Sequence, residues 1–303
     1  MYLEVTENRI KIMSNLMIAT TLCVLLLITV GGIVRTTGSG LGCPDWPLCY
    51  GKVLPPFEYH AIIEYIHRFV ASIIVGPLVL VNFALVVLWM RKSKGLLWLS
   101  VATVVLLLIQ GGLGAVTVLN ELPPAIVAIH LSIGELFFAL IIIQTTLMCK
   151  YRSSGSTSVQ LTKKISLLTI IAVPVMYLVL ISGSLVTANG ALAACLSWPL
   201  CGNSGFLASI HMGHRWAVLI LGLFVVYVVH FAIKNREFPG DVRKIAMLVA
   251  LVFVIQIIVG ALMIMLRFPI YLTAAHVAMA SVVWGATVWY AAQLLLSKRS
   301  ISG

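Results

Sequence analysis

Charge is scarce in this sequence. Charged residues make up 10% of the 303 residues and only nine are acidic, whereas an ordinary soluble domain holds about 25% charged residues. Hydrophobic residues make up 61%, against about 45–50% in soluble proteins. A soluble domain of this length could not bury so much apolar surface, which argues against a soluble enzyme and a disordered chain.

The net charge of +11 does not indicate a nucleic-acid binder. The basic residues form short clusters between long apolar runs, which is the pattern of a multi-pass protein in a lipid bilayer. Eight runs reach the roughly 20 residues that a spanning helix needs. They lie at 14–36, 61–90, 95–119, 124–149, 165–187, 209–233, 245–266 and 270–297. No small-residue cleavage site follows the first, which predicts a retained helix.

The loops alternate in charge. Most basic residues lie in the N-terminus, at 91–94, 150–164 and 234–244, and in the C-terminal tail. By the positive-inside rule both termini are cytoplasmic. The loops near 37–60, 120–123, 188–208 and 267–269 are therefore expected to face outward.

The two halves of the chain resemble each other. GGIVRTTGSGLGCPDWPLCYG at 31–51 matches GSLVTANGALAACLSWPLCG at 183–202, and EYIHRFV at 64–70 matches HMGHRWA at 211–217. IQGGLGA at 109–115 matches IQIIVGA at 255–261, and in that register His130 aligns with His276.

Four spans in each half make the repeat parallel. The predicted fold is an all-α integral membrane protein with eight transmembrane helices in two pseudo-symmetric four-helix bundles. The predicted domains are residues 1–150, a cytoplasmic linker at 151–164, and residues 165–303.

Four histidines are expected at one depth. His67, His130, His214 and His276 lie on every second span, at similar distances before the next cytoplasmic basic residue. Ionisable residues within spans are functional candidates, and imidazole suits iron, zinc and copper. Two histidines per bundle argue against a four-ligand zinc site and favour a haem between facing helices. The predicted pairs are His67 with His130 and His214 with His276.

Glu64 distinguishes the two halves. It lies three residues before His67 on the same helix face, and its aligned residue is His211. A carboxylate beside a haem can serve as acid or base; the alternative is an ion pair with Arg68. Glu135, five residues after His130, points away from it and is expected to be structural.

Three arginines lie near the histidine level. Arg35, Arg68 and Arg215 are candidates to bind haem propionates through bidentate hydrogen bonds. The alternative is that they extend to the membrane surface as interfacial arginines do.

Two cysteine pairs lie in outward loops, where disulfides persist. Cys43 and Cys49, like Cys195 and Cys201, are spaced to close a small ring. For Cys195–Cys201 we expect a structural staple, whereas Cys43–Cys49 is either a staple or redox-active. The remaining cysteines, Cys23 and Cys149, are expected to be packing residues.

These motifs together resemble haem A synthase. The resemblance rests on GGxxRxTGSGLGCPDWPLC in the first outward loop, ExxHR opening the second span and a second WPLC loop. The set of motifs is completed by HR at the start of the sixth span and by single histidines in the fourth and eighth spans. The resemblance covers nearly the whole chain. Cysteine pairs in both loops resemble the form found in many bacteria.

The resemblance implies an oxidoreductase of the bacterial cytoplasmic membrane. Such an enzyme oxidises the C8 methyl group of haem O to a formyl group in two hydroxylations, the second followed by loss of water. His67 and His130 would flank the substrate haem, with Glu64 as the essential carboxylate. The implied partners are haem O synthase, proteins that assemble the terminal oxidase, and an unidentified electron donor.

The resemblance also assigns the second half. His214 and His276 would ligate a haem b that relays electrons, and Cys43 and Cys49 would take part in electron delivery. Two departures affect the surroundings of this haem: His211, and Thr187 at the repeat position of Arg35.

Three other classes of protein compete with this interpretation. A di-haem cytochrome would use the four histidines but would gain nothing from Glu64 in one half. A thiol oxidase needs reactive cysteines but no histidine quartet. A transporter is compatible with the repeat, yet the spans lack broken-helix signals apart from Pro77 and Pro174.

Overall fold

The computed structural model describes residues 6–152, 163–202, 204–234 and 240–297. Regular structure in these residues is helical, apart from one isolated bridge between Cys49 and Lys52. Eight helical spans are long and apolar enough to cross a membrane. The predicted all-α membrane fold is therefore confirmed.

The helices follow the predicted spans closely. They are α1 (Glu7–Thr36), α2 (Tyr59–Phe69), α3 (Gly76–Trp89), α4 (Lys94–Leu119), α5 (Pro124–Arg152), α6 (Lys163–Ala188), α7 (Phe206–Lys234), α8 (Gly240–Met265) and α9 (Ile270–Ser297). Helix α1 begins several residues before the predicted start, because hydropathy marks only the apolar part of a helix that continues past the hydrocarbon.

Helices α2 and α3 form one span, joined by a π-helical turn at Val70–Val75. The backbone N–H of Gly76 bonds to the carbonyl of Ala71, five residues earlier. Pro77 follows directly and has no N–H to continue the α-helical ladder. The wider π-helical turn accommodates the missing N–H donor. It also rotates the directions in which the side chains after the turn point.

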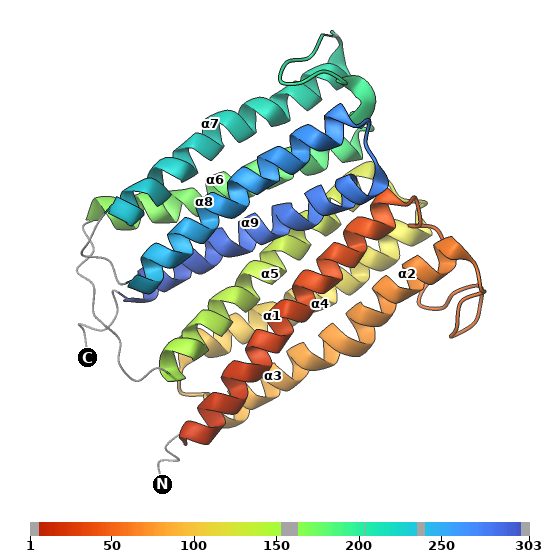
Figure 1. Ribbon diagram of the computed structural model, residues 1–303. Helices are drawn as coiled ribbons and strands as arrows, with labels where there is room; N and C mark the ends of the chain where they lie inside the picture. Colours follow the sequence, from red (N-terminus) through yellow and green to blue (C-terminus); the bar gives the residue numbers. More distant parts are fainter. Residues whose placement is uncertain (1–5, 153–162, 203, 235–239, 298–303) are drawn as a thin grey trace. The chain divides into compact units, whose positions relative to one another are not determined.

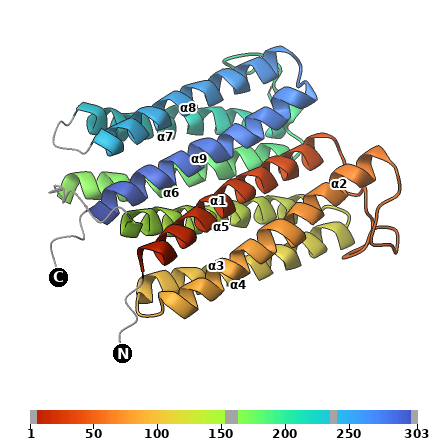
Figure 2. The same cartoon turned by 60° about the horizontal axis from the view of Figure 1, so that its bottom comes forward.

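The chain divides into two compact units (Figures 1 and 2). One comprises Met1–Ile126 and Ile133–Gly155, and the other comprises Val127–Ser132 and Ser156–Gly303. The boundary at 155 falls within the predicted linker, of which residues 153–162 lie outside the described ranges. The domain division at 150 and 165, and the pseudo-symmetry of the bundles, stay predictions.

Each unit is a bundle with its own contacts. In the first, α1 contacts α2 and α3, α3 contacts α4, and side-chain hydrogen bonds connect α5 to α1 and α4. In the second, α6 contacts α7, α7 contacts α8, α8 contacts α9, and α9 contacts α6, which closes the ring of helices.

The ends of α1 and α6 have the same backbone geometry. The N–H of Ser39 bonds to the carbonyl of Val34, and the N–H of Ala191 bonds to that of Val186. This helix-ending motif needs a left-handed residue after the last turn. Gly38 and Gly190 supply it, with φ of 68° and 67°. The repeated glycine of the two sequence motifs thus has a backbone role.

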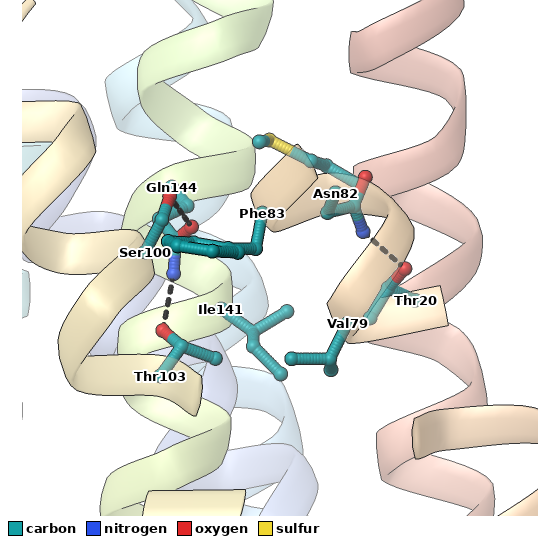
Figure 3. A pocket seen from close by; sticks show the side chains of 9 residues that line it. Thr20, Val79, Asn82, Phe83, Ser100, Thr103, Ile141 and Gln144 are labelled. Carbon is teal, nitrogen blue, oxygen red and sulfur yellow. Dashed lines mark hydrogen bonds between the residues drawn. The ribbon is translucent and has the colours of Figure 1, made fainter. Parts of the chain in front are cut away.

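A layer of polar side chains lies inside the first unit (Figure 3). Asn82 Nδ2 donates to Thr20 Oγ1 over 2.7 Å, and Ser100 Oγ donates to Gln144 Oε1 over 2.9 Å. Gln144 Nε2 in turn donates to Thr103 Oγ1 over 2.5 Å. These side chains line a small pocket between α1, α3, α4 and α5. Interhelical hydrogen bonds in a bilayer contribute about 0.6 kcal/mol each.

The second unit is apolar at the aligned positions. In the register of the repeat, this layer corresponds to Ala172, Val229, Ala246, Val249 and Tyr290, all of which are buried. Apart from the Tyr290 hydroxyl, these side chains offer no hydrogen-bonding group. The two bundles therefore have aligned motifs at their loop ends and different interiors.

Candidate functional site

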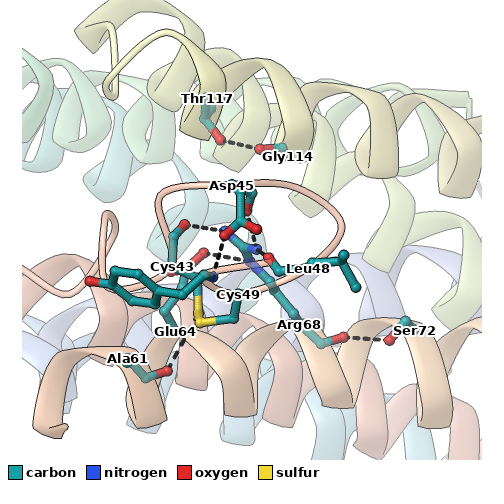
Figure 4. Close-up of polar contacts among 11 residues, drawn as sticks. Cys43, Asp45, Leu48, Cys49, Ala61, Glu64, Arg68, Ser72, Gly114 and Thr117 are labelled. Carbon is teal, nitrogen blue, oxygen red and sulfur yellow. Dashed lines mark hydrogen bonds and ion pairs between the residues drawn. A yellow bond between two sulfur atoms is a disulfide. The ribbon is translucent and has the colours of Figure 1, made fainter. Parts of the chain in front are cut away.

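Arg68 fastens the first disulfide loop to α2 (Figure 4). Its Nη1 donates to the backbone carbonyls of Asp45 over 2.7 Å and Leu48 over 2.8 Å. Its Nη2 donates to the carbonyl of Cys43 over 2.8 Å. Its Nε forms an ion pair with Glu64 Oε1 at 3.0 Å. The guanidinium therefore fixes the loop directly above the Glu64 carboxylate, which is 5% exposed.

Arg215 repeats this contact in the second unit. Its Nη1 donates to the carbonyls of Ser197 over 2.7 Å and Pro199 over 2.8 Å, and its Nη2 donates to that of Cys195 over 2.9 Å. Here the buried His211 stands at the sequence position that aligns with Glu64. Consequently the buried Nε of Arg215 has no hydrogen-bond partner among the described residues.

Both predicted disulfides are present. The Cα atoms of Cys43 and Cys49 are 4.6 Å apart, and those of Cys195 and Cys201 are 5.2 Å apart. Cys43 and Cys49 are 0% and 2% exposed and pack against Ala61 of α2. A soluble reductant could reach this bond only after the loop moves. Cys23 and Cys149 are half-buried free thiols.

The carboxylate of Asp45 holds the turn of the first loop. It accepts hydrogen bonds from the backbone N–H groups of Tyr50 at 2.6 Å and Gly51 at 2.7 Å. The bond from Gly51 is the largest cause that lowers the pKa of Asp45 below its ordinary 3.8. A carboxyl with a lowered pKa stabilises the folded loop above about pH 4 and loses that contribution as the pH falls through its folded value.

This gives a pH prediction for the loop. Backbone amide protection at Tyr50 and Gly51, corrected for intrinsic exchange, should stay constant from neutral pH down to about pH 4 and fall below it. In Asp45→Asn the protection should be lower at neutral pH and should not change with pH. Hydrogen–deuterium exchange measures both, and a wild-type loop that keeps full protection well below pH 3 would contradict the role of the Asp45 charge.

The ring of His214 is held by a hydrogen bond to the neighbouring helix α6. Ser182 Oγ donates to the carbonyl of Val179 over 2.6 Å, and the same oxygen lies 2.8 Å from His214 Nδ1. A hydroxyl has one proton, so the hydrogen between Ser182 and His214 must be that of Nδ1. The lone pair of Nε2 is then available, as an axial ligand requires.

Glycines on neighbouring helices give the imidazoles room. A Cβ added at Gly183 would lie 3.1 Å from His214 Cε1, and one at Gly260 would lie 2.8 Å from His276 Cε1. In the first unit, a Cβ at Gly31 would lie 3.1 Å from His67 Cε1. Each position is tighter than ordinary contact, so a side chain there would displace the ring.

His214 on α7 and His276 on α9 both belong to the second unit. The amide nitrogen of Gln256 on α8 donates to the backbone carbonyl of His276 over 3.0 Å and also lies 3.4 Å from the ring Nε2 of His276. The buried Nδ1 of His276 has no hydrogen-bond partner in the described part of the chain. An orphaned ring nitrogen, a paired imidazole and a glycine beside each ring fit a planar group held by two histidines.

The residues also indicate which metal group fits. Within the described ranges, no three His, Cys, Asp or Glu side chains converge as ligands of a bare ion. A haem brings four nitrogen ligands of its own and needs only two from the protein. The donor set of the second unit therefore matches a haem better than a zinc ion.

The other predicted site residues take separate places. His67 lies on α2, whereas His130 lies in Val127–Ser132, the stretch of α5 that groups with the second unit. Glu135, also on α5, is 1% exposed. Arg35 lies exposed in the last turn of α1. Their predicted roles, including the pairing of His67 with His130, stay predictions.

Propionate binding by the arginines also stays a prediction. Arginine has five N–H donors, and Arg68 uses four of them on the loop and Glu64. Sequence reasoning missed this loop contact, as well as Ser182 beside His214. The repeat could have indicated the contact between each arginine and its loop, because each arginine directly follows a histidine and each half contains a WPLC loop.

The fold and the site together define a multi-pass helical membrane protein with half-buried histidines on its spans. The model of a family described as cytochrome oxidase assembly protein matches residues 14–60 and 56–288. The haem A synthase of Bacillus licheniformis is 29% identical over 292 residues, which cover 92% of this chain and 95% of the relative.

Two further haem A synthases match over similar lengths. That of Geobacillus kaustophilus is 29% identical, covering 93% of this chain and 91% of the relative. That of Geobacillus thermodenitrificans is 31% identical, covering 88% and 86%. The chain therefore belongs to the cytochrome oxidase assembly protein family that includes the haem A synthases, as its motifs predicted.

Proposed function

We propose that this protein is a haem A synthase that oxidises the C8 methyl group of haem O to a formyl group, by two hydroxylations and a loss of water. The observation that carries the proposal is the difference between Glu64 and His211. The two units have the same glycine, histidine and arginine contacts, yet only one places a buried carboxylate beside its histidine. In a protein that only transfers electrons, that carboxylate would have no role beyond its ion pair with Arg68.

The N-terminal half of the sequence is proposed to bind the substrate. His67 and His130 of that half would each bind haem O, which fixes the macrocycle and leaves an edge for chemistry. Glu64 would hold or move a proton near that edge, or stabilise positive charge developing there. The loop held by Arg68 covers Glu64 and keeps bulk water away from it.

The second unit is proposed to bind haem b. His214 and His276 would be its axial ligands, with Ser182 fixing the tautomer of His214. The bound haem would supply one-electron transfer at its iron. A relay needs ligands but no proton path, and in this unit the buried carboxylate of the first unit is replaced by His211.

The setting is proposed to be the bacterial cytoplasmic membrane, with both termini cytoplasmic and the disulfide loops outside. Haem O carries an isoprenoid tail and partitions into lipid, so an enzyme that modifies it belongs in the bilayer. A haem O synthase would supply the substrate, and the haem A product would be used in the assembly of a terminal oxidase. An electron donor would supply the electrons that the reaction requires.

The function is tested by pigment extraction. The protein is expressed with and without a source of haem O, and the extracted haems are separated by chromatography. The proposal expects haem A only when both are present. Haem O that stays unconverted beside a bound haem b, at good yields of folded protein, would instead indicate a di-haem cytochrome.

The role of Cys43–Cys49 gives a separate prediction. Because both sulfurs are buried under the loop held by Arg68, we expect a staple. Cys43→Ser with Cys49→Ser should lower the melting temperature while turnover per folded molecule stays within about twofold, since removal of a small disulfide acts mainly on stability. The matched control is Cys195→Ser with Cys201→Ser. Turnover that collapses in the first variant alone, with the haem spectrum intact, would assign the pair to electron delivery.

A further inference from the structure

A chain of hydrogen bonds connects the end of α1 to His60 in the first turn of α2. Thr37 Oγ1 donates to the carbonyl of Ile33 over 2.7 Å. Ser39 Oγ lies 2.7 Å from Thr37 Oγ1 and 2.9 Å from His60 Nδ1. Ser39 is completely buried, whereas the His60 side chain is exposed. The chain therefore runs from a helix end to a solvent-facing imidazole.

The chain fixes which nitrogen of His60 carries the proton. Each hydroxyl has one proton, and that of Thr37 is given to the Ile33 carbonyl. Ser39 must then donate to Thr37, so that the hydrogen between Ser39 and His60 is that of Nδ1. In the neutral ring Nε2 is left with its lone pair as a proton acceptor.

His60 stands on the same helix face as Glu64. Residues four apart on a helix are neighbours, with Cβ atoms about 5–6 Å apart. Glu64 is buried and pairs with Arg68, one further turn along α2. The backbone of Gly42 packs so closely on the His60 carbonyl that a side chain there would clash. His60 thus lies between a buried carboxylate and the exposed end of the unit.

The second unit lacks this arrangement. Helices α2 and α7 begin in register, at Tyr59 and Phe206. In that register Leu207 replaces His60, and His211 replaces Glu64. In the register of the loops, Ala191 replaces Ser39. The imidazole and the serine that orients it therefore occur only in the unit that carries the carboxylate.

We propose that His60 carries protons between the Glu64 carboxyl group and water at the disulfide end of the first unit. The proton leaves the Glu64 carboxyl, crosses one water molecule and binds His60 Nε2, which becomes an imidazolium. Nε2 then releases the proton to bulk water, while the other proton stays on Nδ1 and keeps its hydrogen bond to Ser39 Oγ. No electron moves in this step. The proposal rests on the proposed function, and His60 acts on the reaction through Glu64.

The test compares His60→Gln and His60→Leu with Ser39→Ala in the full-length protein in lipid discs supplied with haem O. Glutamine keeps a hydrogen bond to Ser39 but cannot take up a proton, and leucine is the residue of the second unit. Both variants should lower the rate of haem A formation by about tenfold or more, since positioned proton transfer contributes about 10²–10⁴-fold. Ser39→Ala should lower it less, and His230→Leu, an exposed histidine on α7, should leave it unchanged.

Two further measurements separate a proton relay from a structural role. Added imidazole should restore part of the rate in His60→Leu, and the haem b spectrum should match that of wild type in every variant. Nitrogen NMR of labelled histidine should show His60 protonated at Nδ1 in wild type, with the signal shifted in Ser39→Ala.

Three results would overturn the proposal. They are a His60→Gln rate within twofold of wild type, a His60→Leu variant that folds normally but gains nothing from imidazole, and a wild-type His60 protonated at Nε2. A wild-type protein that forms no haem A at all would overturn the proposed function, and with it the relay.

Discussion

Glu64→Ala is expected to stop haem A formation while the second unit still binds haem b through His214 and His276. The reason is that Glu64 is a buried carboxylate near the proposed ligand His67, and the relay half has His211 at the aligned position. Loss of a general acid or base lowers a rate by about 10²–10⁴-fold. The measurement is the haem composition of the purified variant, by chromatography, at matched expression.

The ion pair with Arg68 complicates that experiment. Glu64 accepts from Arg68 Nε, and Arg68 holds the disulfide loop, so alanine removes both a carboxylate and a loop contact. Glu64→Gln separates the two, because its amide oxygen still accepts from Arg68 but it cannot carry a charge or a proton. We expect it to be as inactive as Glu64→Ala, with the loop protected as in wild type.

Two more substitutions complete the series. Glu64→Asp should retain less activity than wild type, since the shorter side chain moves the carboxyl by more than about 1 Å from its place. His211→Ala, the matched change in the second unit, should be far milder. If Glu64→Gln made haem A at a wild-type rate, or if His211→Ala were the inactive variant, the reaction site would not be in the first unit.

His214→Ala and His276→Ala are expected to remove the low-spin haem b spectrum. Each supplies one of the two axial imidazoles in the proposal. The purified variants are compared by absorption spectroscopy at equal protein concentration. Ser182→Ala should keep the spectrum but lower haem affinity by about 10–100-fold, because the hydrogen bond that fixes the ligand tautomer is lost.

The glycines provide an independent control on the same pocket. Gly260→Val should displace the His276 ring without removing a ligand, since even a Cβ would lie 2.8 Å from Cε1. We expect a weakened or five-coordinate spectrum. A six-coordinate spectrum that persists in both histidine variants would place haem b elsewhere, whatever the glycine variant shows.

The spans were predictable because hydropathy over about 20 residues depends on little besides composition. The contacts of the loops were not. Arg68 and Arg215 bind backbone carbonyls, and every residue has a carbonyl, so residue type did not identify Asp45 or Leu48 as partners. The same holds for Ser182, whose bond to His214 depends on how α6 faces α7.

The candidate histidines were predictable from their depth and from the repeat, whereas their surroundings were not. The π-helical turn at Val70–Val75 changes the helix face after His67, which a fixed helical period does not anticipate. Pro77 gave a signal for an irregularity but not for its type.

The polar layer of the first unit bears on the order in which its helices enter the membrane. Thr20 comes first in the chain, Asn82 comes later on α3, and Gln144 arrives last on α5. Until α5 enters, Ser100 and Thr103 of α4 lack their glutamine partner. The first bundle is therefore complete only when α5 is inserted. Replacing Gln144 would remove hydrogen bonds that help to set the rotation of α5 about its own axis. The second bundle has no such layer at the aligned positions, where its helices pack through apolar side chains and Tyr290.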